Sequence, residues 1–491
     1  MGAAENYKLD SFEIFRNVIN NELTTTAQTR HAINPSTGEP LPDVPLSTPE
    51  DVDRAVAAAQ AAFPAWSGLS QDERADYLSK FADAVDANKE ELITLLGREA
   101  GKPPQLATME ILGCVAQIRG TSKFRLTEEK VEETDERVVT VRHVPIGVGV
   151  GIIPWNFPAL LGIIKLSAAL LTGNTFIWKP SPYTPNTALK IGELAAKVFP
   201  KGVVNVLSGD ESLGPLFTAH PGVAKISFTG SVATGKKVMQ ACAGTLKRFT
   251  LELGGNDPAI IYPDVDVAKV APMIAQLALI HTGQVCMAAK RIYVHEDIYD
   301  TFVAAVANFI KSSIKMGMSN DPEAAIGPIQ NSMQFGKLQG LYSQIDKQGW
   351  KAIPVAGSSF GNNNAGGYFL APTLIDNPPE DSQIVVEEQF GPIVPMLKWS
   401  DEDDVVRRAN ATQMGLGASV WGGDQARAER TARRLEAGSV WVNHFVSVGP
   451  LAPYSGHKQS GIGAESGMEG LRGWCNIQTV WTAKSSSVNG K

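Results

Sequence analysis

Leu251-Glu252-Leu253-Gly254-Gly255 closes the stretch, from residue 147 to residue 255, that decides the fold of this 491-residue chain. Short β-rich runs alternate there with helical runs such as 187–198 and 235–241. The expected strands are 148–153, 175–179, 203–207, 225–228 and 249–253. This alternation is typical of a parallel sheet flanked by helices, so we predict an α/β fold with a nucleotide-binding arrangement.

The segments on either side extend this fold. Residues 49–112 carry apolar side chains at three- and four-residue spacing, so we expect helices there that pack on the same sheet. A second α/β unit is expected from about residue 254, with strands at 290–294 and 439–443 and a helix at 299–316. At 491 residues, the chain also exceeds the size at which a single hydrophobic core stops growing, which predicts two or three domains.

A charged segment, residues 127–137, precedes the alternating run Val138-Val139-Thr140-Val141-Arg142. The pattern predicts an exposed hairpin. We therefore expect one domain from residues 1–126 and 147–253, the nucleotide-binding one, and a second from residues 254–470. An arm and tail would comprise residues 127–146 and 471–491.

Composition excludes several classes of protein. Hydrophobic residues make up 43% of the chain and charged residues 19%, with a formal net charge of −7. These values describe a globular protein rather than a disordered chain or a nucleic-acid surface. The longest apolar region, residues 159–171, is interrupted by polar residues and is too short to span a bilayer. We expect no nucleic-acid partner, no membrane association and, because the N-terminus carries no targeting pattern, a cytoplasmic location.

The chain has four scattered cysteines and no CxxC pair; they are Cys114, Cys242, Cys286 and Cys475. This spacing argues against a disulfide framework and against a structural zinc site, and it fits a reducing compartment. The seven histidines form no HxxxH or HExxH spacing. We therefore predict no catalytic metal.

Two short motifs carry the chemistry. Glu252 stands just before two glycines, and Cys286 stands thirty-four residues later in the turn Gly283-Gln284-Val285-Cys286. A carboxylate and a thiol in such positions suit covalent chemistry on a carbonyl group. Thiolate attack on an aldehyde gives a tetrahedral adduct, hydride loss gives a thioester, and water activated by a carboxylate hydrolyses that thioester.

These motifs resemble those of the aldehyde dehydrogenase superfamily, in which further motifs follow in the same order. They are Pro154-Trp155-Asn156-Phe157-Pro158, Trp178-Lys179-Pro180-Ser181, Phe228-Thr229-Gly230-Ser231, Glu387-Glu388-Gln389-Phe390-Gly391-Pro392 and Gly456-His457-Lys458-Gln459-Ser460-Gly461. The resemblance implies a Rossmann-like cofactor domain, a second α/β catalytic domain and a small β oligomerisation arm. It also implies an NAD(P)-dependent, non-acylating enzyme that assembles as a homodimer or homotetramer.

The resemblance assigns four catalytic residues. Cys286 is the nucleophile and Glu252 the general base, because both stand at the family's positions. Asn156 lies between two prolines that restrict the backbone; read alone it shapes a turn, but the resemblance makes its amide an oxyanion donor beside the backbone amide of Cys286. Lys165 is similar to the family lysine that supports the active site.

The expected cofactor site lacks the usual GxGxxG pattern. Gly147-Val148-Gly149-Val150-Gly151 lies at a strand start and is weak evidence. Thr229, Gly230 and Ser231 instead follow a strand and open a helix, where free amides and the helix dipole suit a pyrophosphate. By resemblance, the remaining cofactor residues are Ile152, Ile153, Trp155, Lys179, Ser181, Pro182, Leu253, Gly254, Glu388 and Phe390.

Cofactor choice depends on one departure from the family. NAD-preferring members often place a glutamate three residues after the lysine that matches Lys179, where it repels a 2′-phosphate, and this chain has Pro182 there. No arginine in residues 179–185 attracts that phosphate. We predict NAD as cofactor, with NADP use possible.

The positions aligned with the family's substrate pocket are all apolar; they are Phe157, Leu161, Ile164, Val285, Met287, Phe445 and Val448. Ile111 and Cys114 are candidates for the same wall. None of these side chains pairs with a charged substrate group, so we predict an aliphatic or aromatic aldehyde as the small-molecule substrate.

Two alternatives remain at the level of sequence. A CoA-acylating dehydrogenase would pass the thioester to CoA instead of water, and the presence of Glu252 argues against it. A catalytically silent relative with a structural or binding role would be expected to lack Cys286 or Glu252, and both are present.

Overall fold

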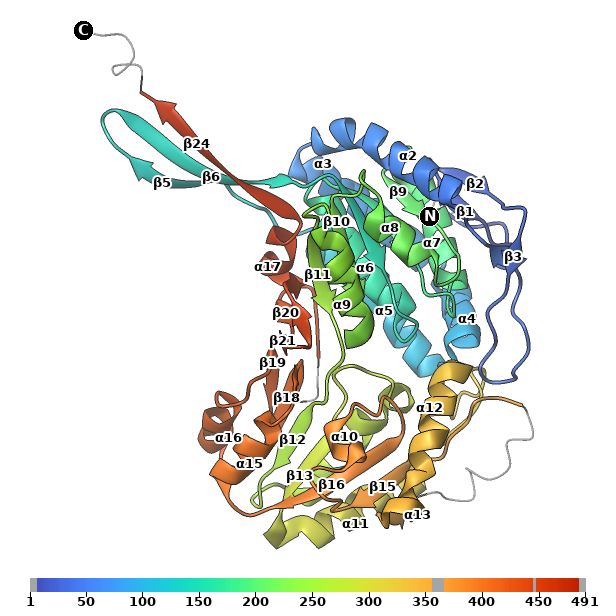
Figure 1. Cartoon of the computed structure of the whole chain (residues 1–491), viewed down its shortest axis with the longest axis vertical. Helices are drawn as coiled ribbons and strands as arrows, with labels where there is room; N and C mark the ends of the chain where they lie inside the picture. Colours follow the sequence, from blue (N-terminus) through green and yellow to red (C-terminus); the bar gives the residue numbers. More distant parts are fainter. Residues whose placement is uncertain (1–6, 356–365, 445–446, 485–491) are drawn as a thin grey trace.

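The computed structural model describes residues 7–355, 366–444 and 447–484. Two mixed α/β units lie one above the other, and a narrow β arm projects from the upper one (Figure 1). The fold is therefore the predicted one: two sheets with helices on their faces, and a small antiparallel arm.

The first sheet has eight strands in the order β2-β1-β9-β8-β7-β10-β11-β22. Its five central strands are parallel, and each end lies within one residue of the expected one; they are β7 (Val148–Ile152), β8 (Thr175–Lys179), β9 (Val204–Val206), β10 (Lys225–Thr229) and β11 (Arg248–Glu252). Antiparallel edges are added by β1 (Asn17–Ile19), β2 (Glu22–Thr24) and β22 (Gly461–Ile462). Because parallel strands end at the same edge, Lys179, Thr229 and Glu252 share one side of the sheet.

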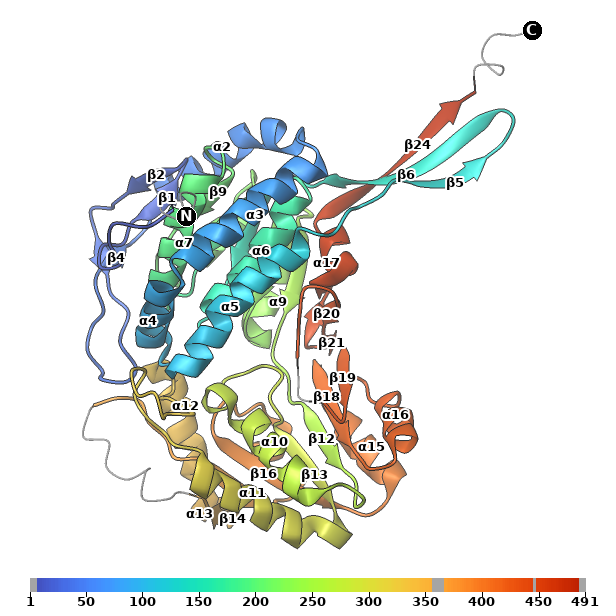
Figure 2. The same cartoon turned by 180° about the vertical axis from the view of Figure 1, so that it is seen from behind.

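Helices cover both faces of this sheet (Figures 1 and 2). One face packs against α2 (Pro49–Ser67), α8 (Leu213–Ala219) and α9 (Val232–Ala243). The other packs against α3 (Gln71–Ala87), α4 (Lys89–Ala100), α5 (Pro104–Thr121), α6 (Pro158–Leu171) and α7 (Asn186–Val198). Thr48 and Ser70 begin α2 and α3 with capping boxes, which satisfy free amides of the first turn.

Helix α6 is the buried element that links two of the predicted catalytic residues. Its first amides, on Ala159 and Leu160, donate to the Glu110 carboxylate at 2.9 and 3.1 Å, and Glu110 forms a fully buried ion pair with Lys102. This cap fixes the start of the helix just after Asn156 and buries Lys165 two turns later.

The glycines of β7 have a packing role. An added Cβ at Gly149 would lie 2.3 Å from the Trp474 ring, and one at Gly151 would lie 2.5 Å from the Phe176 ring. The glycine run at this strand therefore accommodates aromatic side chains of the core rather than a phosphate.

The second sheet has the order β14-β15-β16-β13-β12-β18-β19 and is parallel except at β14. Its strands are β12 (Pro258–Ile261), β13 (Arg291–His295), β14 (Lys351–Pro354), β15 (Thr373–Asp376), β16 (Ile393–Trp399), β18 (Gly417–Trp421) and β19 (Ser439–Val442). One face packs on α10 (Val267–Leu279) and α11 (Tyr299–Ser313). The other packs on α12 (Ser332–Tyr342), α13 (Gln344–Gln348), α14 (Gln383–Val386), α15 (Glu402–Asn410) and α16 (Gln425–Ala432).

The arm consists of three antiparallel strands in the order β24-β6-β5; they are β5 (Glu129–Glu133), β6 (Arg137–Pro145) and β24 (Cys475–Ala483). The two predicted arm segments therefore form one sheet. Before it, the chain returns from the second unit through β22 and α17 (Gly467–Arg472), and Leu471 and Trp474 are buried in the core of the first unit. Short pairs complete the fold: β3 (Thr29–Arg30) with β4 (Val44–Pro45), β17 (Met414–Gly415) with β21 (His457–Lys458), and β20 (Tyr454–Ser455) with β23 (Ala464–Glu465).

Within the three described ranges, no helix is long and apolar enough to cross a membrane. In the same ranges, no three His, Cys, Asp or Glu side chains are grouped so that they could hold a metal ion.

Candidate active site

A pocket of about 190 Å³ lies where the carboxyl edge of the first sheet meets the second unit. Eleven of the predicted site residues line it: Trp155, Asn156, Thr229, Gly230, Ser231, Glu252, Leu253, Gly254, Cys286, Glu388 and Phe390. Four more lining residues were not predicted, namely Pro154, Met333, Gln334 and Lys337. The structure thus brings together side chains that lie more than two hundred residues apart in the sequence.

The turn that carries Cys286 has an unusual backbone. His281, Thr282 and Gly283 have φ values of 49°, 58° and 75°. Residues other than glycine rarely adopt this left-handed region of backbone conformation. A Cβ at Gly283 would lie 2.3 Å from the carbonyl oxygen of Gly391. The Gln284 side chain holds the turn in place by donating to the His281 carbonyl at 2.9 Å and accepting from the Gln330 amide at 2.9 Å.

The segment that faces this turn is strained as well. Phe390, next to Gly391, has a φ of 53°. Its ring meets Trp155 of the first unit edge to face, with centroids 5.4 Å apart. Two strained segments therefore contact one another at Gly283 and Gly391, and each presents a pocket residue.

The Cys286 thiol lines the pocket and is surrounded by charged groups. Burial raises the pKa of the thiol well above its ordinary value, and the carboxyl group of Glu252 acts in the same direction. The Lys290 ammonium lowers it, while Glu388 and Asp257 raise it further. At rest, the protonated thiol is therefore favoured.

Glu252 ends β11 and is 3% exposed. Neither carboxyl oxygen has a hydrogen-bond partner in the described structure. Burial raises the pKa of this carboxyl group to about 8, helped by Glu465 and opposed by Lys165 and the Cys286 thiol. A buried carboxyl group without partners, next to a thiol, can exchange protons near neutral pH.

Asn156 lies in the buried turn between β7 and α6. Its amide nitrogen donates to the Gln284 carbonyl at 3.1 Å, so this side chain bridges the first unit to the turn that bears Cys286. An asparagine amide has two N–H donors, and only one is used in this contact. The other is available to an oxygen in the pocket.

Lys165 does not line the pocket but supports it from beneath. Its ammonium is buried, pairs with Glu465 and donates to the Thr229 hydroxyl at 2.7 Å. Ser227 also donates to Glu465, at 3.2 Å. This network fixes the end of β10, where Thr229 enters the pocket.

Glu388 enters the pocket from the second unit. Its Oε1 accepts from the Gly255 amide at 3.1 Å and from the Lys290 ammonium at 3.0 Å. A Cβ at Gly254 would lie 2.4 Å from the other oxygen, so only glycine leaves room for this carboxylate. The Lys337 ammonium donates to the Glu388 carbonyl at 3.2 Å.

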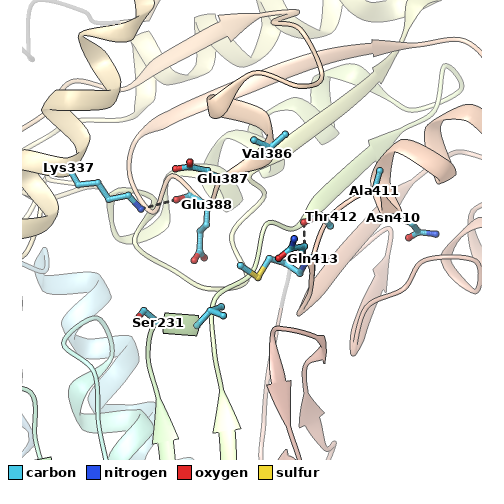
Figure 3. A pocket seen from close by; sticks show the side chains of 11 residues that line it. Ser231, Lys337, Val386, Glu387, Glu388, Asn410, Ala411, Thr412 and Gln413 are labelled. Atoms are coloured by element: carbon cyan, nitrogen blue, oxygen red, sulfur yellow. Dashed lines mark hydrogen bonds between the residues drawn. The ribbon is translucent and has the colours of Figure 1, made fainter. Parts of the chain in front are cut away.

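A larger open hollow of about 780 Å³ adjoins the pocket and shares Ser231, Lys337 and Glu388 with it (Figure 3). Ser231 comes from the first unit and Glu388 from the second, so the hollow lies between them. Ser231 caps α9 by accepting from the Thr234 amide at 3.2 Å. Ser231 and Val232, at the start of α9, line this hollow, and a helix N-terminus at such a place fits an anion such as a pyrophosphate.

Lys179 ends β8 at a separate part of the same sheet edge. Burial lowers the pKa of this lysine to about 8, opposed by Glu211 and Asp210. Among the described residues no carboxylate lies within ion-pair distance of its ammonium, which leaves a buried cation ready for a polar ligand. The residues along this edge therefore fit a dinucleotide.

The structure adds a cation that the sequence prediction missed at this end. Arg30, from the N-terminal β3, donates to the carbonyl of Pro182 and lies close enough to influence the pKa of Lys179. The segment 179–185 contains no arginine, as expected, but the chain supplies one from 152 residues away. The sequence carries no local signal for this contact, because it depends on how the N-terminal segment folds: β1 pairs antiparallel with β9.

The other predicted cofactor residues are buried beside this edge. Ile152 and Ile153 are 8% and 2% exposed and belong to the hydrophobic cores on opposite faces of the first sheet. Ser181 is buried, and its hydroxyl accepts from the Tyr183 amide at 3.2 Å. Pro182 is buried at the carbonyl contact with Arg30.

The predicted substrate residues do not line the 190 Å³ pocket. Phe157, Leu161 and Met287 are partly exposed, Ile164 and Val285 are buried, and Val448 is 41% exposed. Phe445 lies outside the described residues. Ile111 and Cys114, also considered for this wall, are fully buried in the core, because α5 turns that face toward α6.

Comparison with known proteins agrees with this arrangement. The model of the aldehyde dehydrogenase family matches residues 23–480. The aldehyde dehydrogenase LUC3 of Fusarium sp is 41% identical over 473 residues, which cover 96% of this chain and 100% of LUC3.

Two solved structures show the same fold. The AldA indole-3-acetaldehyde dehydrogenase of P. syringae, solved as a variant with NAD+ and IAA, is 31% identical with a TM-score of 0.93, covering 98% of each chain. An NADP-dependent enzyme of E. coli is 31% identical with a TM-score of 0.92, covering 97% of this chain and 100% of its own. This chain therefore belongs to the aldehyde dehydrogenase family and is an NAD(P)-dependent member of it.

Proposed function

We propose that the chain oxidises an aldehyde to a carboxylic acid through a thioester on Cys286. The observation that carries this proposal is the meeting of the Cys286 thiol and the unpartnered carboxyl group of Glu252 in one pocket, beside the Asn156 amide. The bound dinucleotide supplies the hydride acceptor. Every other step is assigned to side chains of this protein.

The proposed sequence begins with proton transfer. The base form of Glu252 takes the thiol proton, and the sulfur of Cys286 forms a bond with the aldehyde carbon. The second N–H of Asn156 and the backbone amide of Cys286 stabilise the charge on the aldehyde oxygen. After hydride loss, Glu252 removes a proton from water, which attacks the thioester and releases the acid.

For the cofactor we propose a division of work along the sheet edge. Lys179 holds the adenosine ribose, the α9 terminus at Ser231 holds the pyrophosphate, and Glu388 holds the nicotinamide ribose. The Trp155 and Phe390 rings, in contact across the two units, pack beside the nicotinamide. We expect NAD as the preferred cofactor and NADP as a weaker one.

We propose an apolar aliphatic or aromatic aldehyde as substrate. The support is the apolar character of Phe157, Leu161 and Met287, together with the exposed Met109 and Leu112 on α5. The P. syringae relative acts, by its name, on indole-3-acetaldehyde, which is an aromatic aldehyde. A panel of aliphatic, aromatic and ω-carboxylated aldehydes tests this, and a preference for the carboxylated members would contradict it.

We propose that the arm mediates assembly into a homodimer or homotetramer and that the two sheets correspond to a cofactor and a catalytic domain. Ile477 and Trp481 of β24 are 72% and 62% exposed. Large apolar side chains that are this exposed on a strand indicate a surface that another chain covers. Sedimentation velocity of an Ile477→Asp/Trp481→Asp variant is expected to give a smaller species. An unchanged sedimentation coefficient would remove the arm from the interface.

Replacement of the thiol tests the proposed function. Cys286→Ala is expected to abolish turnover while the dissociation constant of NAD, measured by fluorescence, stays unchanged. Cys475→Ala is the matched control, because Cys475 is also partly exposed but lies in the arm. Turnover retained by Cys286→Ala would exclude this thiol as the nucleophile.

A further inference from the structure

Tyr454 carries a buried hydroxyl group that has no hydrogen-bond partner among the described residues. Buried tyrosine hydroxyls are usually paired, since an unpaired one costs free energy. The residue lies in β20, where it is paired in register with Glu465 of β23, the carboxylate that holds Lys165. Its backbone is therefore tied to the network under the active site.

The ionisable side chains that face this hydroxyl are those of the active site. Among these side chains, the Cys286 thiol has the largest effect on the pKa of the Tyr454 phenol, followed by the carboxyl groups of Glu252 and Asp257. Tyr454 does not line the 190 Å³ pocket, whereas Cys286 and Glu252 do. The backbone geometry places the two segments side by side: the Ser460 hydroxyl, from the segment that follows Tyr454, donates to the Gly254 carbonyl at 2.6 Å, and a Cβ at Gly255 would lie 2.6 Å from the Cys286 carbonyl oxygen.

Most of the charged groups that affect the pKa of the Cys286 thiol are carboxyl groups. Three carboxyl groups face it, from Glu252 in β11, Asp257 in the loop that follows, and Glu388 beyond α14. The cation among these groups, Lys290, is already engaged by the Cys286 carbonyl and by Glu388. A thiolate formed among these carboxyl groups therefore needs a hydrogen bond from elsewhere.

The phenol of Tyr454 is suited to supply it. Burial raises the pKa of the phenol well above its ordinary value, and the nearby Cys286 and Glu252 act in the same direction. The hydroxyl therefore keeps its proton throughout the working range of pH and remains a donor. A hydrogen bond from a neutral donor to a charged acceptor is stronger than one between neutral groups.

We propose that the Tyr454 hydroxyl donates a hydrogen bond to the sulfur of Cys286 and thereby stabilises the thiolate that attacks the aldehyde. The proposal rests on the assignment of Cys286 as nucleophile. The thiol proton goes to the Glu252 carboxylate and the S–C bond forms as the carbonyl π electrons move to oxygen, while Tyr454 keeps its own proton. It also gives the unpaired hydroxyl its partner.

Alkylation of the thiol tests this without any turnover. The rate of Cys286 modification by iodoacetamide is measured against pH in the wild type and in Tyr454→Phe, with peptide mass analysis to separate Cys286 from the other cysteines. The apparent pKa of alkylation is expected to rise by about one unit in the variant, which leaves about tenfold less thiolate at a given pH. Turnover kcat/KM is expected to fall by a similar factor.

The matched control is Tyr342→Phe. Tyr342 is, like Tyr454, a partly buried tyrosine, and its hydroxyl donates to the Ala371 carbonyl at 2.6 Å. Its alkylation profile is expected to equal that of the wild type, and unchanged NAD binding shows that both variants are folded.

Two results would overturn the proposal. One is a wild-type alkylation profile in Tyr454→Phe. The other is a variant that alkylates normally but accumulates acyl-enzyme, since the hydroxyl would then serve Glu252 and the hydrolytic water. Neither result affects the role of Cys286, which fails only if Cys286→Ala retains turnover.

Discussion

At the scale of single residues, the site depends on carboxyl groups that are buried without partners. Glu252 has a pKa of about 8, and Asp257 has one of about 7; burial is the main cause in both. Such groups hold a proton in the folded state at a pH where the unfolded chain has lost it. They therefore favour function at the expense of stability.

This linkage gives a prediction for Glu252→Gln. Because the folded pKa is raised, the wild type loses stability as the pH rises from about 4.5 to about 8, at about 1.4 kcal/mol for each unit of pKa difference. The glutamine variant has no such loss. Its Tm advantage over the wild type is expected to be small at pH 5 and larger at pH 8.

Calorimetry at the two pH values measures this difference, with Glu296→Gln, at an exposed position, as the control. A Tm difference between Glu252→Gln and the wild type that is the same at both pH values would contradict the raised pKa.

Asn156 gives a second prediction at this scale. Asn156→Ala removes one preorganised donor, so kcat/KM is expected to fall by roughly 10²–10³-fold. Because the same amide holds the Gln284 carbonyl, the thiol turn must be checked separately. A wild-type rate of Cys286 alkylation in the variant shows that the turn is in place; activity within threefold of wild type would rule out an oxyanion role.

At the scale of elements, the strained thiol turn and the Phe390 segment hold each other. Gly283→Ala places a Cβ at a φ of 75° and 2.3 Å from the Gly391 carbonyl oxygen. We expect a loss of roughly 1–3 kcal/mol in the free energy of unfolding, together with a loss of activity as the turn moves.

Gly336 provides the matched control for this substitution. It lies inside α12, and an added Cβ there meets nothing within 4 Å. Gly336→Ala is expected to stabilise the protein by about 0.5–1 kcal/mol, since alanine favours a helix interior. Denaturant unfolding of the two variants compares them, and equal effects would exclude the backbone contact as the cause.

The elements show how far the sequence could be read. The alternation of short apolar runs predicted the ends of β7, β8, β10 and β11 to within one residue, because a buried parallel strand has a local signature. The motifs of Cys286 and Glu252 could likewise be recognised from the residues next to them in the sequence.

Contacts that join distant segments left no such signature. Arg30 reaches Pro182 only because the chain start folds along the first sheet, and Tyr454 faces Cys286 only because the chain returns there after the second sheet. The left-handed backbone at His281 and Thr282 could not be predicted from the sequence either, since neither residue type favours it. Local patterns predicted the elements, and tertiary contacts decided their detailed chemistry.

At the scale of the whole molecule, we expect the choice between NAD and NADP to depend on the N-terminal segment. Arg30 lies beside Lys179 and Pro182, with Asp210 and Glu211 nearby. Arg30→Gln is expected to raise the dissociation constant of NADP about three- to tenfold and to leave that of NAD nearly unchanged, because only NADP carries the 2′-phosphate. The difference should shrink at high salt.

Titration with 2′-AMP and 5′-AMP measures this end of the site alone, and Arg54→Gln, an exposed arginine of α2, is the control. Pro182→Glu is expected to weaken NADP binding in the same direction by repulsion. Equal effects of Arg30→Gln on 2′-AMP and 5′-AMP would show that Arg30 holds the loop rather than reading the phosphate.

The central claim is that an acyl group is carried on Cys286 and released by Glu252. Glu252→Gln is mixed with aldehyde and NAD, quenched in acid and analysed by intact mass and peptide mapping. The account predicts a burst of NADH, an added mass equal to the acyl group on the Cys286 peptide, and hydrolysis slowed by about 10²–10⁴-fold. No adduct on Cys286 together with steady turnover at the wild-type rate would contradict it.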